Sequence, residues 1–388
     1  MMDGTRNPGH DMSDPNPTQS DTGSNAWLRF ICADLGNAVR AKLLSALGAP
    51  EHILSASPAT LRGAGAQAAD LDAIAQVDED RVHNAAAWLT APDHHLLTCD
   101  GPFWPETLRD IPDAPVALFV DGDPSLLAMP ALAIVGSRNP TPQGADNAQQ
   151  FARYLAGHGL AIVSGLATGI DASAHRGALA ADGATVAVLG TGIDQFYPTG
   201  NRDLQLQIAR AGCVVSEYAP GRPAVAGQFP ARNRIISGLS LGTLVVEATR
   251  RSGSLITARL AGEQGRSVFA IPGSIHNPLS RGCHQLIRQG ALLVESADDI
   301  FSDIGPRLSQ AAAAAKHAPE TPETKTDQAP DADYQRVLDA LGWDPQGIDI
   351  LTERTGLTPA ELSSMLLIME LDGLVAKAPG GGYIRGTR

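Results

Sequence analysis

The sequence predicts an α/β protein built on a Rossmann-like, doubly wound and mostly parallel sheet, with a small helical domain before it and a winged-helix domain after it. Seven short apolar runs rich in β-branched residues alternate with helix-like stretches between residues 131 and 294. This alternation is typical of a parallel sheet covered by helices on both faces. The chain has 388 residues, which is too long for one small core and indicates several domains.

The N-terminal region predicts a tail and a helical domain. Residues 1–24 are polar, rich in Pro, Asn, Asp and Ser, and lack the apolar core of a signal peptide, so we expect a disordered tail. Residues 25–100 contain short helical patterns separated by glycine turns at 48–50 and 62–65. This arrangement is SAM-like or helix-hairpin-helix-like. Such a hairpin can hold a phosphate, but the acidic composition of the segment fits a plain packing domain equally well.

The central domain is predicted over residues 101–305. It opens with an extended connector at 104–115 and a strand at 116–120. Glycines such as Gly212, Gly265 and Gly290 mark the ends of its helices. The expected strands of the sheet are residues 132–135, 160–163, 185–189, 213–215, 243–246, 267–271 and 291–294.

The C-terminal part predicts a flexible linker over 306–330 and a winged-helix domain over 331–388. The linker holds a five-alanine run followed by Pro, Glu, Thr, Lys and Gln. Three helical patterns follow the linker, and the third begins with Thr358 as N-cap and Pro359 at N1. After them come two short strands around a glycine turn. The domain has 5 basic and 9 acidic residues, and its expected recognition helix carries Glu361 and Glu370 but no Lys or Arg. We therefore expect a structural role or a protein contact there rather than DNA binding.

Charge is distributed unevenly along the chain. The net charge is −13, yet residues 131–290 contain 14 Arg, no Lys and 8 acidic residues, which gives +6. The remainder has 15 basic and 34 acidic residues, which gives −19. A GC-rich genome explains the preference for Arg over Lys but not this asymmetry. An arginine-only basic centre suits phosphate, because the planar guanidinium pairs with it bidentately.

Several functional classes are disfavoured by missing motifs. The four cysteines are far apart with no CxxC spacing, which fits reduced thiols in the cytoplasm and gives no metal site. The sequence contains no run of about 18 apolar residues, so we expect no membrane span. Neither a GxGxxG turn nor a P-loop is present, so we expect no dinucleotide cofactor, no ATP hydrolysis and no other cofactor.

The candidate site lies where the strands end, since ligands of doubly wound sheets bind beyond the carboxyl ends of the strands. Glycines there allow close approach, and Ser and N–H groups donate to phosphate. Arg138 is the first candidate, with a salt bridge to Asp171 or Glu217 as the alternative. The strand-end residues selected for nucleic-acid binding are Gly136, Ser137, Arg138, Ser164, Gly165 and Gly169.

A second candidate cluster is the run Phe229-Pro-Ala-Arg-Asn-Arg234. We expect Arg232 and Arg234 to bind phosphate and Phe229 to stack on a base. Asn233 either joins them or caps the helix, and the two arginines have Glu247 as an alternative partner. The third cluster is Ser252-Gly253-Ser254, which follows two arginines at a helix start and suits an anion.

Two other patterns have more than one interpretation. Tyr197 and Pro198 are either a rim with stacking and phosphate contacts or a packed turn. Asp171 and His175 are four residues apart on one helix face, where they can form an acid–base pair. The favoured alternative is that Asp171 fixes its loop and His175 packs beneath it. We therefore assign no catalytic residue and no metal ligand, and expect a binding protein rather than an enzyme.

The order of the motifs is similar to that of the DNA-processing protein A family. The resemblance rests on seven ordered motifs between about residues 105 and 294, among them Ile134-Val-Gly-Ser-Arg138, Phe229-Pro-x-Arg-Asn-Arg234 and Ser252-Gly-Ser-Leu-Ile-Thr-Ala258. Two departures are Trp104-Pro105 in place of the usual Tyr-Pro, and Ala231 where relatives often have a basic residue. The resemblance implies a Rossmann-like homodimer that binds single-stranded DNA, protects incoming strands during natural transformation and loads the RecA recombinase. The family's binding motifs correspond to Gly136–Arg138 and to Phe229, Arg232, Asn233 and Arg234.

Two rival functions follow from other features. Gly242 and Thr243 followed by Glu247 resemble the phosphate turn of Rossmann-like nucleotide phosphoribohydrolases, with Glu217 and Glu247 as the carboxylates. Such an enzyme would release a base from a nucleotide. The third possibility is a protein-interaction scaffold, which would have no salt-sensitive affinity for DNA.

Overall fold

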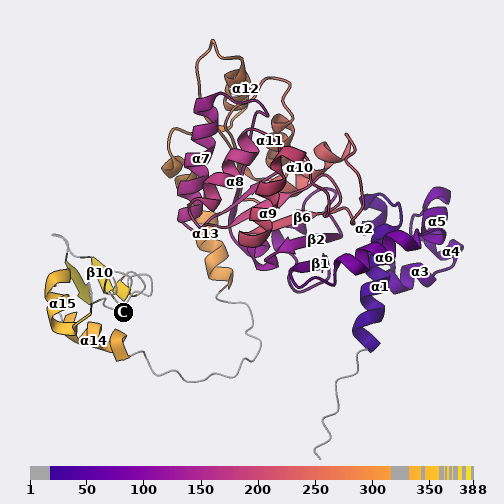
Figure 1. Cartoon of the computed structure of the whole chain (residues 1–388), viewed down its shortest axis with the longest axis horizontal. Helices are drawn as coiled ribbons and strands as arrows, with labels where there is room; N and C mark the ends of the chain where they lie inside the picture. Colours follow the sequence, from indigo (N-terminus) through magenta and orange to yellow (C-terminus); the bar gives the residue numbers. More distant parts are fainter. Residues whose placement is uncertain are drawn as a thin grey trace, which may run out of the picture. The chain divides into compact units, whose positions relative to one another are not determined.

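The computed structural model describes residues 18–315, 332–341, 346–357, 362, 365, 366, 369, 375–377 and 382–385. The chain divides into two compact units, residues 1–316 and 317–388, which are drawn in Figure 1. The first unit contains the helical domain and the sheet. The second contains the described part of the C-terminal domain.

The helical domain begins earlier than the sequence predicts. Helix α1 starts at Thr18, inside the segment expected to be a disordered tail, so that boundary is wrong. Its last turns bury Leu28 and Phe30, and a helix anchored at one end extends because propagation is easier than nucleation. Side-chain caps from Ser57 and Asp78 begin two of the later helices. The helices are α1 Thr18–Cys32, α2 Asn37–Leu47, α3 Pro50–Ser55, α4 Pro58–Gly63, α5 Ala68–Ala75 and α6 Glu79–Trp88.

The sheet has nine strands in the order β1-β2-β6-β5-β4-β3-β7-β8-β9. β1 and β2 are antiparallel additions at one edge, and the other pairs are parallel. All seven apolar runs are strands, as predicted. The strands are β1 His94–Thr98, β2 Ala117–Gly122, β3 Ala131–Val135, β4 Ala161–Ser164, β5 Thr185–Val188, β6 Cys213–Ser216, β7 Gly242–Val245, β8 Ser267–Ala270 and β9 Leu292–Leu293.

Strand β1 corrects the boundary expected at residue 100. It lies in the segment assigned to the helical domain, yet it pairs with β2 over its whole length, with Leu96 opposite Phe119. An isolated five-residue strand gives little sequence signal, because strands become stable only beside a partner.

The strand order contains a switch point beside β3. From β3 the chain adds β4, β5 and β6 on one side, then returns to place β7 on the other side of β3 and continues to β8 and β9. Ligands of doubly wound sheets bind at such a reversal. The groove described below lies there.

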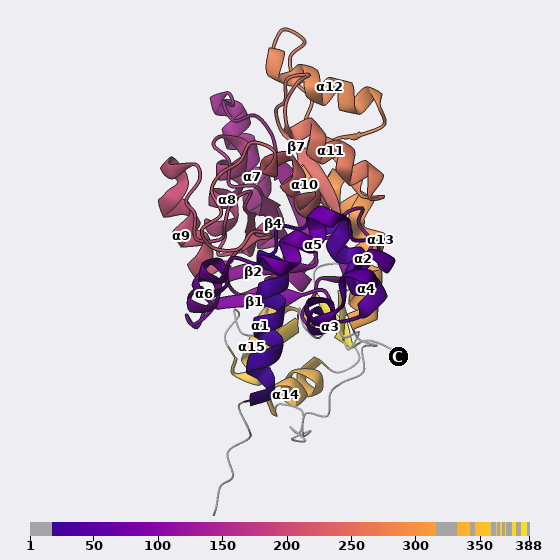
Figure 2. The same cartoon turned by 90° about the vertical axis from the view of Figure 1, so that its right-hand side faces the viewer.

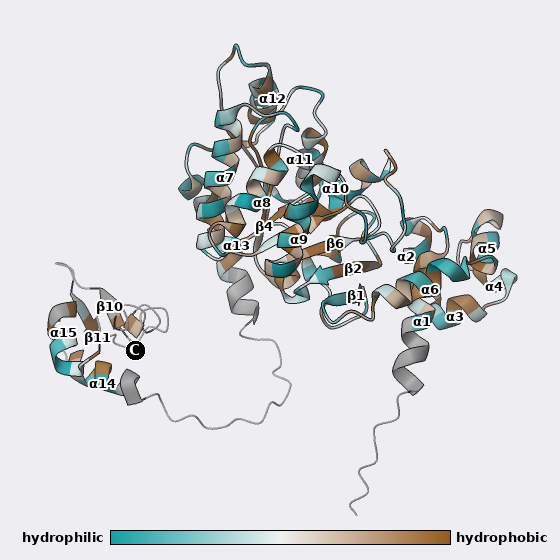
Figure 3. Ribbon diagram, viewed as in Figure 1, coloured by the Kyte–Doolittle hydropathy of each residue, from teal (hydrophilic) through white to brown (hydrophobic). Residues whose placement is uncertain are grey.

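Helices cover both faces of the sheet, as Figures 1 and 2 show. One apolar layer holds α7 Pro142–Gly157, α8 Ile170–Leu179, α9 Arg202–Ala211 and α13 Ala297–Ala315 against one face. The other holds α10 Gln228–Gly238, α11 Ser254–Glu263 and α12 Arg281–Arg288 against the opposite face. Hydrophobic strands lie between helices whose outer sides are polar (Figure 3). Short 3-10 turns occur at η1 Glu106–Leu108, η2 Pro124–Ala128, η3 Thr199–Asn201 and η4 Pro278–Ser280.

Helix α13 extends into the segment predicted to be a linker. It continues through Pro306 to Ala315, past the expected boundary at 305. Ile300 and Ile304 anchor it, because both are fully buried against the sheet. The alanine run then continues the helix, since alanine has the highest helix propensity. The rest of the expected linker lies outside the described residues.

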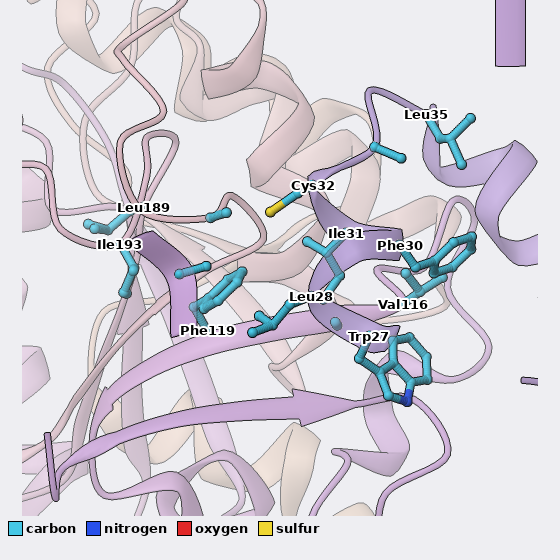
Figure 4. Packing of buried hydrophobic residues seen from close by; sticks show 14 of the residues in the cluster. Trp27, Leu28, Phe30, Ile31, Cys32, Leu35, Val116, Phe119, Leu189 and Ile193 are labelled. Atoms are coloured by element: carbon cyan, nitrogen blue, oxygen red, sulfur yellow. The ribbon is translucent and has the colours of Figure 1, made fainter. Parts of the chain in front are cut away.

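The helical domain and the sheet share one buried cluster. In Figure 4, Leu28 and Ile31 of α1 lie over the sheet beside Phe119 of β2, with Leu189 and Ile193 nearby. Burial of side chains this size stabilises by about 1.5–3 kcal/mol each. The helical domain is therefore packed on the sheet rather than tethered to it.

The second unit has the elements of a winged-helix domain. Helices α14 Ala332–Leu341 and α15 Ile348–Thr355 are followed by the antiparallel strands β10 Val375–Lys377 and β11 Tyr383–Arg385. α15 ends at Gly356, whose φ of 73° is left-handed. Leu362, Leu366 and Met369 join the same buried cluster as these helices. The predicted cap at Thr358 and Pro359, and both recognition-helix glutamates, lie outside the described residues.

In the part of the chain that the structure describes, no helix is both long and apolar enough to cross a membrane. The same residues contain no group of three or more His, Cys, Asp or Glu side chains arranged to hold a metal ion.

Candidate nucleic-acid interface

A groove of about 750 Å³ opens at the switch point, beyond the carboxyl ends of β3 and β7. It brings together the three clusters that the sequence selected, from three separate parts of the chain. Predicted site residues in its wall are Gly136, Ser137, Arg138, Phe229, Arg232, Asn233, Ser252, Gly253 and Ser254. The other four, Ser164, Gly165, Gly169 and Arg234, are not among the residues that line it.

The β3 tip is held tightly against the start of α8. The Ile170 N–H donates to the Ser137 carbonyl at 3.1 Å. A Cβ on Gly136 would lie 2.6 Å from Ile170 Cγ1, and one on Gly169, whose φ is 81°, would lie 2.3 Å from the Ser137 oxygen. Both positions therefore require glycine. These glycines fix the backbone that carries Arg138 into the groove.

Arg138 is exposed at the groove wall. It forms no hydrogen bond or ion pair with another described residue, so both alternative pairings, with Asp171 and with Glu217, are wrong. Burial raises the pKa of the Asp171 carboxyl, and the charge of Arg138 is one of the contributions that oppose this rise. An exposed, unpaired guanidinium can exchange its water for a phosphate at little cost.

Two aromatic rings lie together on the groove wall. Phe229, at the start of α10, contacts Tyr197 with ring centroids 5.1 Å apart and planes tilted by 36°. Tyr197 is 46% exposed, so its ring belongs to a rim rather than to a packed turn. Phe229 is half-buried and lies against Gly190, where a Cβ would approach its ring to 2.8 Å. The pair presents aromatic surface on which a base can stack.

Arg232 lines the groove but is 5% exposed and bonded inside the protein. Its Nη1 donates to the carbonyls of Gly165, at 3.0 Å, and Val188. Burial, only partly offset by the Asp171 carboxylate, lowers the pKa of Arg232 to about 10. Arg232 therefore supports the wall from inside the protein, although it is among the residues that line the groove.

Asn233 and Arg234 have different environments although they are adjacent. The Oδ1 of Asn233 accepts from Arg232 Nε at 3.3 Å, and the side chain lines the groove. Asn233 is not a cap, because α10 begins at Gln228. Arg234 is 5% exposed and forms an ion pair with Glu217 at 2.5 Å and a second with Asp113 at 3.3 Å. The alternative that Arg232 and Arg234 pair with Glu247 is therefore wrong.

The start of α11 forms the remaining wall. Ser252 Oγ and Ser254 Oγ are 2.6 Å apart, and the Ser254 N–H donates to Ser252 Oγ at 3.3 Å. Gly253 is exposed between them. The N–H groups of Ser252 and Ser254 are already bonded within the turn, so its hydroxyls are the groups best suited to an anion, at a helix start that favours negative charge.

The remaining strand-end residues are structural. Ser164 Oγ is fully buried and donates to the Ile134 carbonyl at 2.6 Å. The Asp171 carboxylate accepts from the N–H groups of Gly165 and Ala167 and fixes that loop. Burial raises the pKa of Asp171, and the Arg232 charge opposes this. Asp171 is the acidic residue in the groove wall, and it lies against a buried cation.

His175 is buried beneath the site. Its Nδ1 is 2.8 Å from Thr185 Oγ1 and it forms no hydrogen bond with Asp171. Burial, together with the positive charges of Arg232 and Arg176, lowers the pKa of His175 to about 3. The packing interpretation of this pair agrees with the geometry, and the acid–base interpretation does not.

Both carboxylates of the rival enzyme are occupied. Glu247 accepts from the Thr141 N–H at 2.9 Å and from Thr141 Oγ1 at 2.7 Å, which holds the start of α7. Glu217 accepts from Arg234 and from Asn37 of the helical domain. Neither is among the residues that line the groove.

Sequence reasoning missed three polar residues of the wall. Asn139, Thr249 and Thr257 also line the groove. Asn139 directly follows the selected strand tip, so extending that motif by one residue would have included it. Thr249 and Thr257 flank the serine cluster, and only the return of β7 to the side of β3 brings them to the groove.

Comparisons with known proteins agree with this geometry. The sequence model of the family described as DNA recombination-mediator protein A matches residues 95–305, and that of the DprA winged helix domain matches residues 319–381. The chain is 41% identical over 305 residues to protein Smf of Escherichia coli, covering 78% of this chain and 80% of that protein.

Two solved structures are also similar. The structure of DNA processing protein A from Streptococcus pneumoniae matches with a TM-score of 0.64 and 40% identity, over 72% of this chain and 97% of that one. The protein of the same name from Helicobacter pylori, whose structure was described for its single-stranded DNA binding mode, matches with a TM-score of 0.50 and 31% identity, over 55% and 96%.

Proposed function

The chain belongs to the DNA recombination-mediator protein A family, and from this premise we propose that it binds single-stranded DNA in the groove at the β3–β7 switch point. One observation carries the proposal. An exposed, unpaired arginine, two aromatic rings and a hydroxyl-rich helix start line the same cavity. That combination suits a phosphate chain whose bases are unpaired.

The phosphate-binding side consists of Arg138 and the donors around it. Arg138 is free to form a bidentate pair with a phosphate. Ser137, Asn233 and the Ser252–Ser254 turn offer further donors from the two neighbouring walls. Asp171 does not repel the backbone strongly, since it is buried and lies against Arg232.

The base-binding side consists of Phe229 and Tyr197. In duplex DNA the bases are stacked on one another, so these rings are accessible only to a strand with free bases. Preference for single strands therefore follows from the rings, and affinity follows mainly from the phosphate contacts.

We assign the thirteen predicted site residues to three roles. Gly136, Ser137, Arg138, Phe229, Asn233 and the turn Ser252–Ser254 face the strand. Arg232 supports the wall. The remaining residues, Ser164, Gly165, Gly169 and Arg234, hold the strand tips and α10 in position.

The cellular role that we propose is protection of incoming single strands and loading of the RecA recombinase during natural transformation, in the cytoplasm. The names of the matching family and relatives, recombination mediator and DNA processing protein, support it. We also propose a homodimer. Leu292 and Leu293 on the sheet-edge strand β9 are 44% and 46% exposed, and exposed leucines on a strand edge suit a second copy.

The alternative nucleotide-cleaving enzyme has less support. Glu217 and Glu247 already accept hydrogen bonds that hold α10 and α7, and neither lines the groove. A base-release assay with purine and pyrimidine nucleotides tests it directly: turnover that disappears in Glu247→Ala, with the fold retained, would restore the enzyme interpretation.

The main proposal is tested by fluorescence anisotropy of a labelled single-stranded oligonucleotide against salt, with duplex as competitor. We expect salt-sensitive binding that duplex does not displace. Arg138→Ala should weaken binding to all sequences and lower the slope of log K against log salt by roughly 0.7 for each phosphate lost. Arg210→Ala, an exposed arginine in the last turn of α9, is the matched control and should bind as the wild type. Equal affinity of wild type and Arg138→Ala would refute the site.

A further inference from the structure

A separate cavity of about 310 Å³ lies where the helical domain meets the carboxyl end of β6. Its wall combines residues beside α2 and on α6 with part of the segment 217–222 that follows β6. None of these residues lines the groove. β6 and β9 lie in opposite halves of the sheet, so the cavity is also away from the edge proposed for a second copy. It is therefore a site distinct from both.

Three arginines reach this cavity from different elements. Arg40 comes from α2, Arg81 from α6 and Arg222 from the loop after β6, and all three are half-buried. Arg81 and Arg222 share one carboxylate, Asp34, at 3.2 and 3.6 Å. The Asp34 side chain is 70% exposed, and a carboxylate this exposed gains little from its ion pairs. A second anion can therefore replace it between the two cations.

Arg40 has no carboxylate partner among the described residues. Its Nη1 donates to Asn37 Oδ1 at 3.2 Å, and its Nη2 donates to the carbonyls of Ile31 and Ala33 at 2.8 and 2.9 Å. Burial lowers the pKa of Arg40, and the charge of Glu217 opposes this. The Arg40 cation is thus held by neutral acceptors in a partly dry environment, where it attracts an anion more strongly than it would in water.

The second carboxylate of the wall, Glu217, already has a cation. It pairs with Arg234 at 2.5 Å and accepts a hydrogen bond from Asn37. Arg234 is not among the residues that line the cavity. Because Glu217 is matched from outside the wall, the single charge of Asp34 faces three guanidinium groups, and the cavity has an excess of positive charge.

Uncharged donors complete the wall. Tyr218 is half-buried, and its hydroxyl forms no hydrogen bond with another described residue. Burial and the Glu217 charge raise the pKa of Tyr218, so its hydroxyl keeps the proton that it can donate. Helix α2 also begins here, since its N-cap Gly36 lines the cavity and no side chain caps the helix. The first N–H groups of a helix have no partner within it and favour an anion.

We propose that this cavity is a phosphate site that joins the helical domain to the sheet. The phosphate dianion takes the place of Asp34 between Arg81 and Arg222, near the Arg40 cation, and accepts from Tyr218. The volume is at the lower end of small-molecule sites, about 300–1,000 Å³. It suits one phosphate group or a small phosphomonoester rather than a length of strand. The inference does not rest on the proposed function.

The test is the Tm of the full chain in inorganic phosphate, titrated at constant ionic strength with chloride as the balancing anion. A ligand of the folded chain raises Tm, and its dissociation constant follows from the concentration dependence. The variants that remove contacts are Tyr218→Phe and Arg222→Gln. Arg210→Gln, at an exposed arginine of α9, is the matched control for charge. Arg138→Ala removes the free arginine of the groove.

We expect a saturable rise in Tm for the wild type, Arg210→Gln and Arg138→Ala. Tyr218→Phe and Arg222→Gln should each weaken phosphate binding roughly tenfold, because each removes a hydrogen bond to a charged group. Comparison with the control also removes the general stabilising effect of phosphate as a salt.

Removing the competing carboxylate should have the opposite effect. Asp34→Asn should bind phosphate roughly two- to fivefold more tightly, since the ion pairs of Asp34 no longer have to be broken. Asp182→Asn, at another exposed aspartate, is the matched control and should bind as the wild type does.

Free phosphate and the 5′ end of a phosphorylated strand present the same dianion. Once the titration supports the site, 5′-phosphorylated and 5′-hydroxyl oligothymidylates distinguish the two sources. Tighter binding of the phosphorylated strand, with the difference absent in Arg222→Gln, identifies a strand end. Equal affinities identify a free phosphate or a small phosphomonoester.

Three outcomes would overturn the inference: no saturable rise in Tm, the same rise in the wild type and in both Tyr218→Phe and Arg222→Gln, or a loss in Arg138→Ala alone. The third would place the phosphate in the groove. Single-strand affinity is measured separately and without phosphate, so each of these outcomes leaves the proposed function standing. Failure of the strand to bind would refute the proposed function and leave the phosphate site standing.

Discussion

The two sides of helix α10 contrast within one short motif. Phe229 and Asn233 lie in the wall of the groove. Arg234 points into the protein, where it pairs with Glu217 at 2.5 Å, and Arg232 bonds to two backbone carbonyls. The arginine that is free for a ligand, Arg138, comes from the tip of β3 instead. One short motif therefore offers its aromatic and amide side chains to the groove, while its arginines make the bonds that hold the helix.

The difference follows from solvation. A buried guanidinium must have partners, because an unpaired charge in the interior costs several kcal/mol. An exposed one is stabilised by water and can exchange that water for phosphate. Arg234 also reaches beyond its own domain, because its partner Glu217 accepts from Asn37 of the helical domain. The helical domain thus contributes to the position of the helix that carries Phe229.

The largest effect is expected from Arg234→Ala. The substitution leaves the Glu217 carboxylate buried without its cation, which should lower the free energy of unfolding by about 3–5 kcal/mol. Chemical denaturation of the isolated variant measures it. Arg138→Ala is the matched variant on the groove side and should unfold like the wild type. A stable Arg234→Ala protein with weakened DNA affinity would break the contrast, since Arg234 would then be a ligand contact.

The interior beneath the groove should also be sensitive to acid. Thr185 Oγ1 donates to the Ile162 carbonyl, so His175 Nδ1–H donates to Thr185, and the buried Nε2 has no partner. The pKa of His175 is about 3 in the folded chain and about 6.5 unfolded. The unfolded chain therefore binds more protons below pH 6.5, and stability is lost as pH falls through this window.

The size of that loss follows from linkage. Between pH 6.5 and 4.5 His175 should cost about 2–3 kcal/mol of unfolding free energy. The measurement is denaturation of the wild type and of His175→Gln at both pH values. Subtracting one change in unfolding free energy with pH from the other cancels the contribution of the carboxylates that both proteins share. Equal changes of unfolding free energy with pH in the two proteins would mean that His175 is protonated in the folded chain and that water reaches the interior beneath the groove.

On the groove side, Phe229→Ala should weaken single-strand binding by about 1–3 kcal/mol if the ring stacks on a base. Phe229→Leu keeps much of the apolar volume against Gly190 but not the aromatic face, and should lose nearly as much affinity. Phe229→Trp should retain it. If the leucine variant binds like the wild type, the ring packs against the protein rather than stacking on a base. Phe229 would then hold the helix, as Arg232 and Arg234 do, instead of contacting the ligand.

The sequence predicted the sheet well because its strands are buried on both faces. Runs such as Leu132–Val135 are apolar throughout, which is the signal of a parallel strand between two helical layers. Three elements, α1, β1 and α13, lie in or cross segments that the sequence assigned otherwise, and they do so for one shared reason. α1, β1 and α13 are each stabilised by tertiary contacts, with the sheet or with a neighbouring strand, and local composition does not record those contacts.

The site was predicted as a set of motifs but not as a set of roles. Residue type selected Arg138, Arg232 and Arg234 equally, since all three are arginines near strand ends or helix starts. What separates them is burial and partner, and these depend on Glu217 and the Val188 carbonyl, which are distant in the sequence. The meeting of the clusters in one groove depends on strand order, which periodicity does not give.

The smallest effect is expected from deleting residues 331–388. The deleted segment has a net charge of −4, from 5 basic and 9 acidic residues, whereas every residue proposed to face the strand lies in the first compact unit. Affinity for a single-stranded oligonucleotide should therefore change by no more than about twofold, or roughly 0.4 kcal/mol, in a titration at fixed salt. The change should be toward tighter binding, because an acidic segment repels phosphate. A large loss would place part of the DNA site in the second unit, and the contrast between the two sides of α10 would then describe only a fraction of the interface.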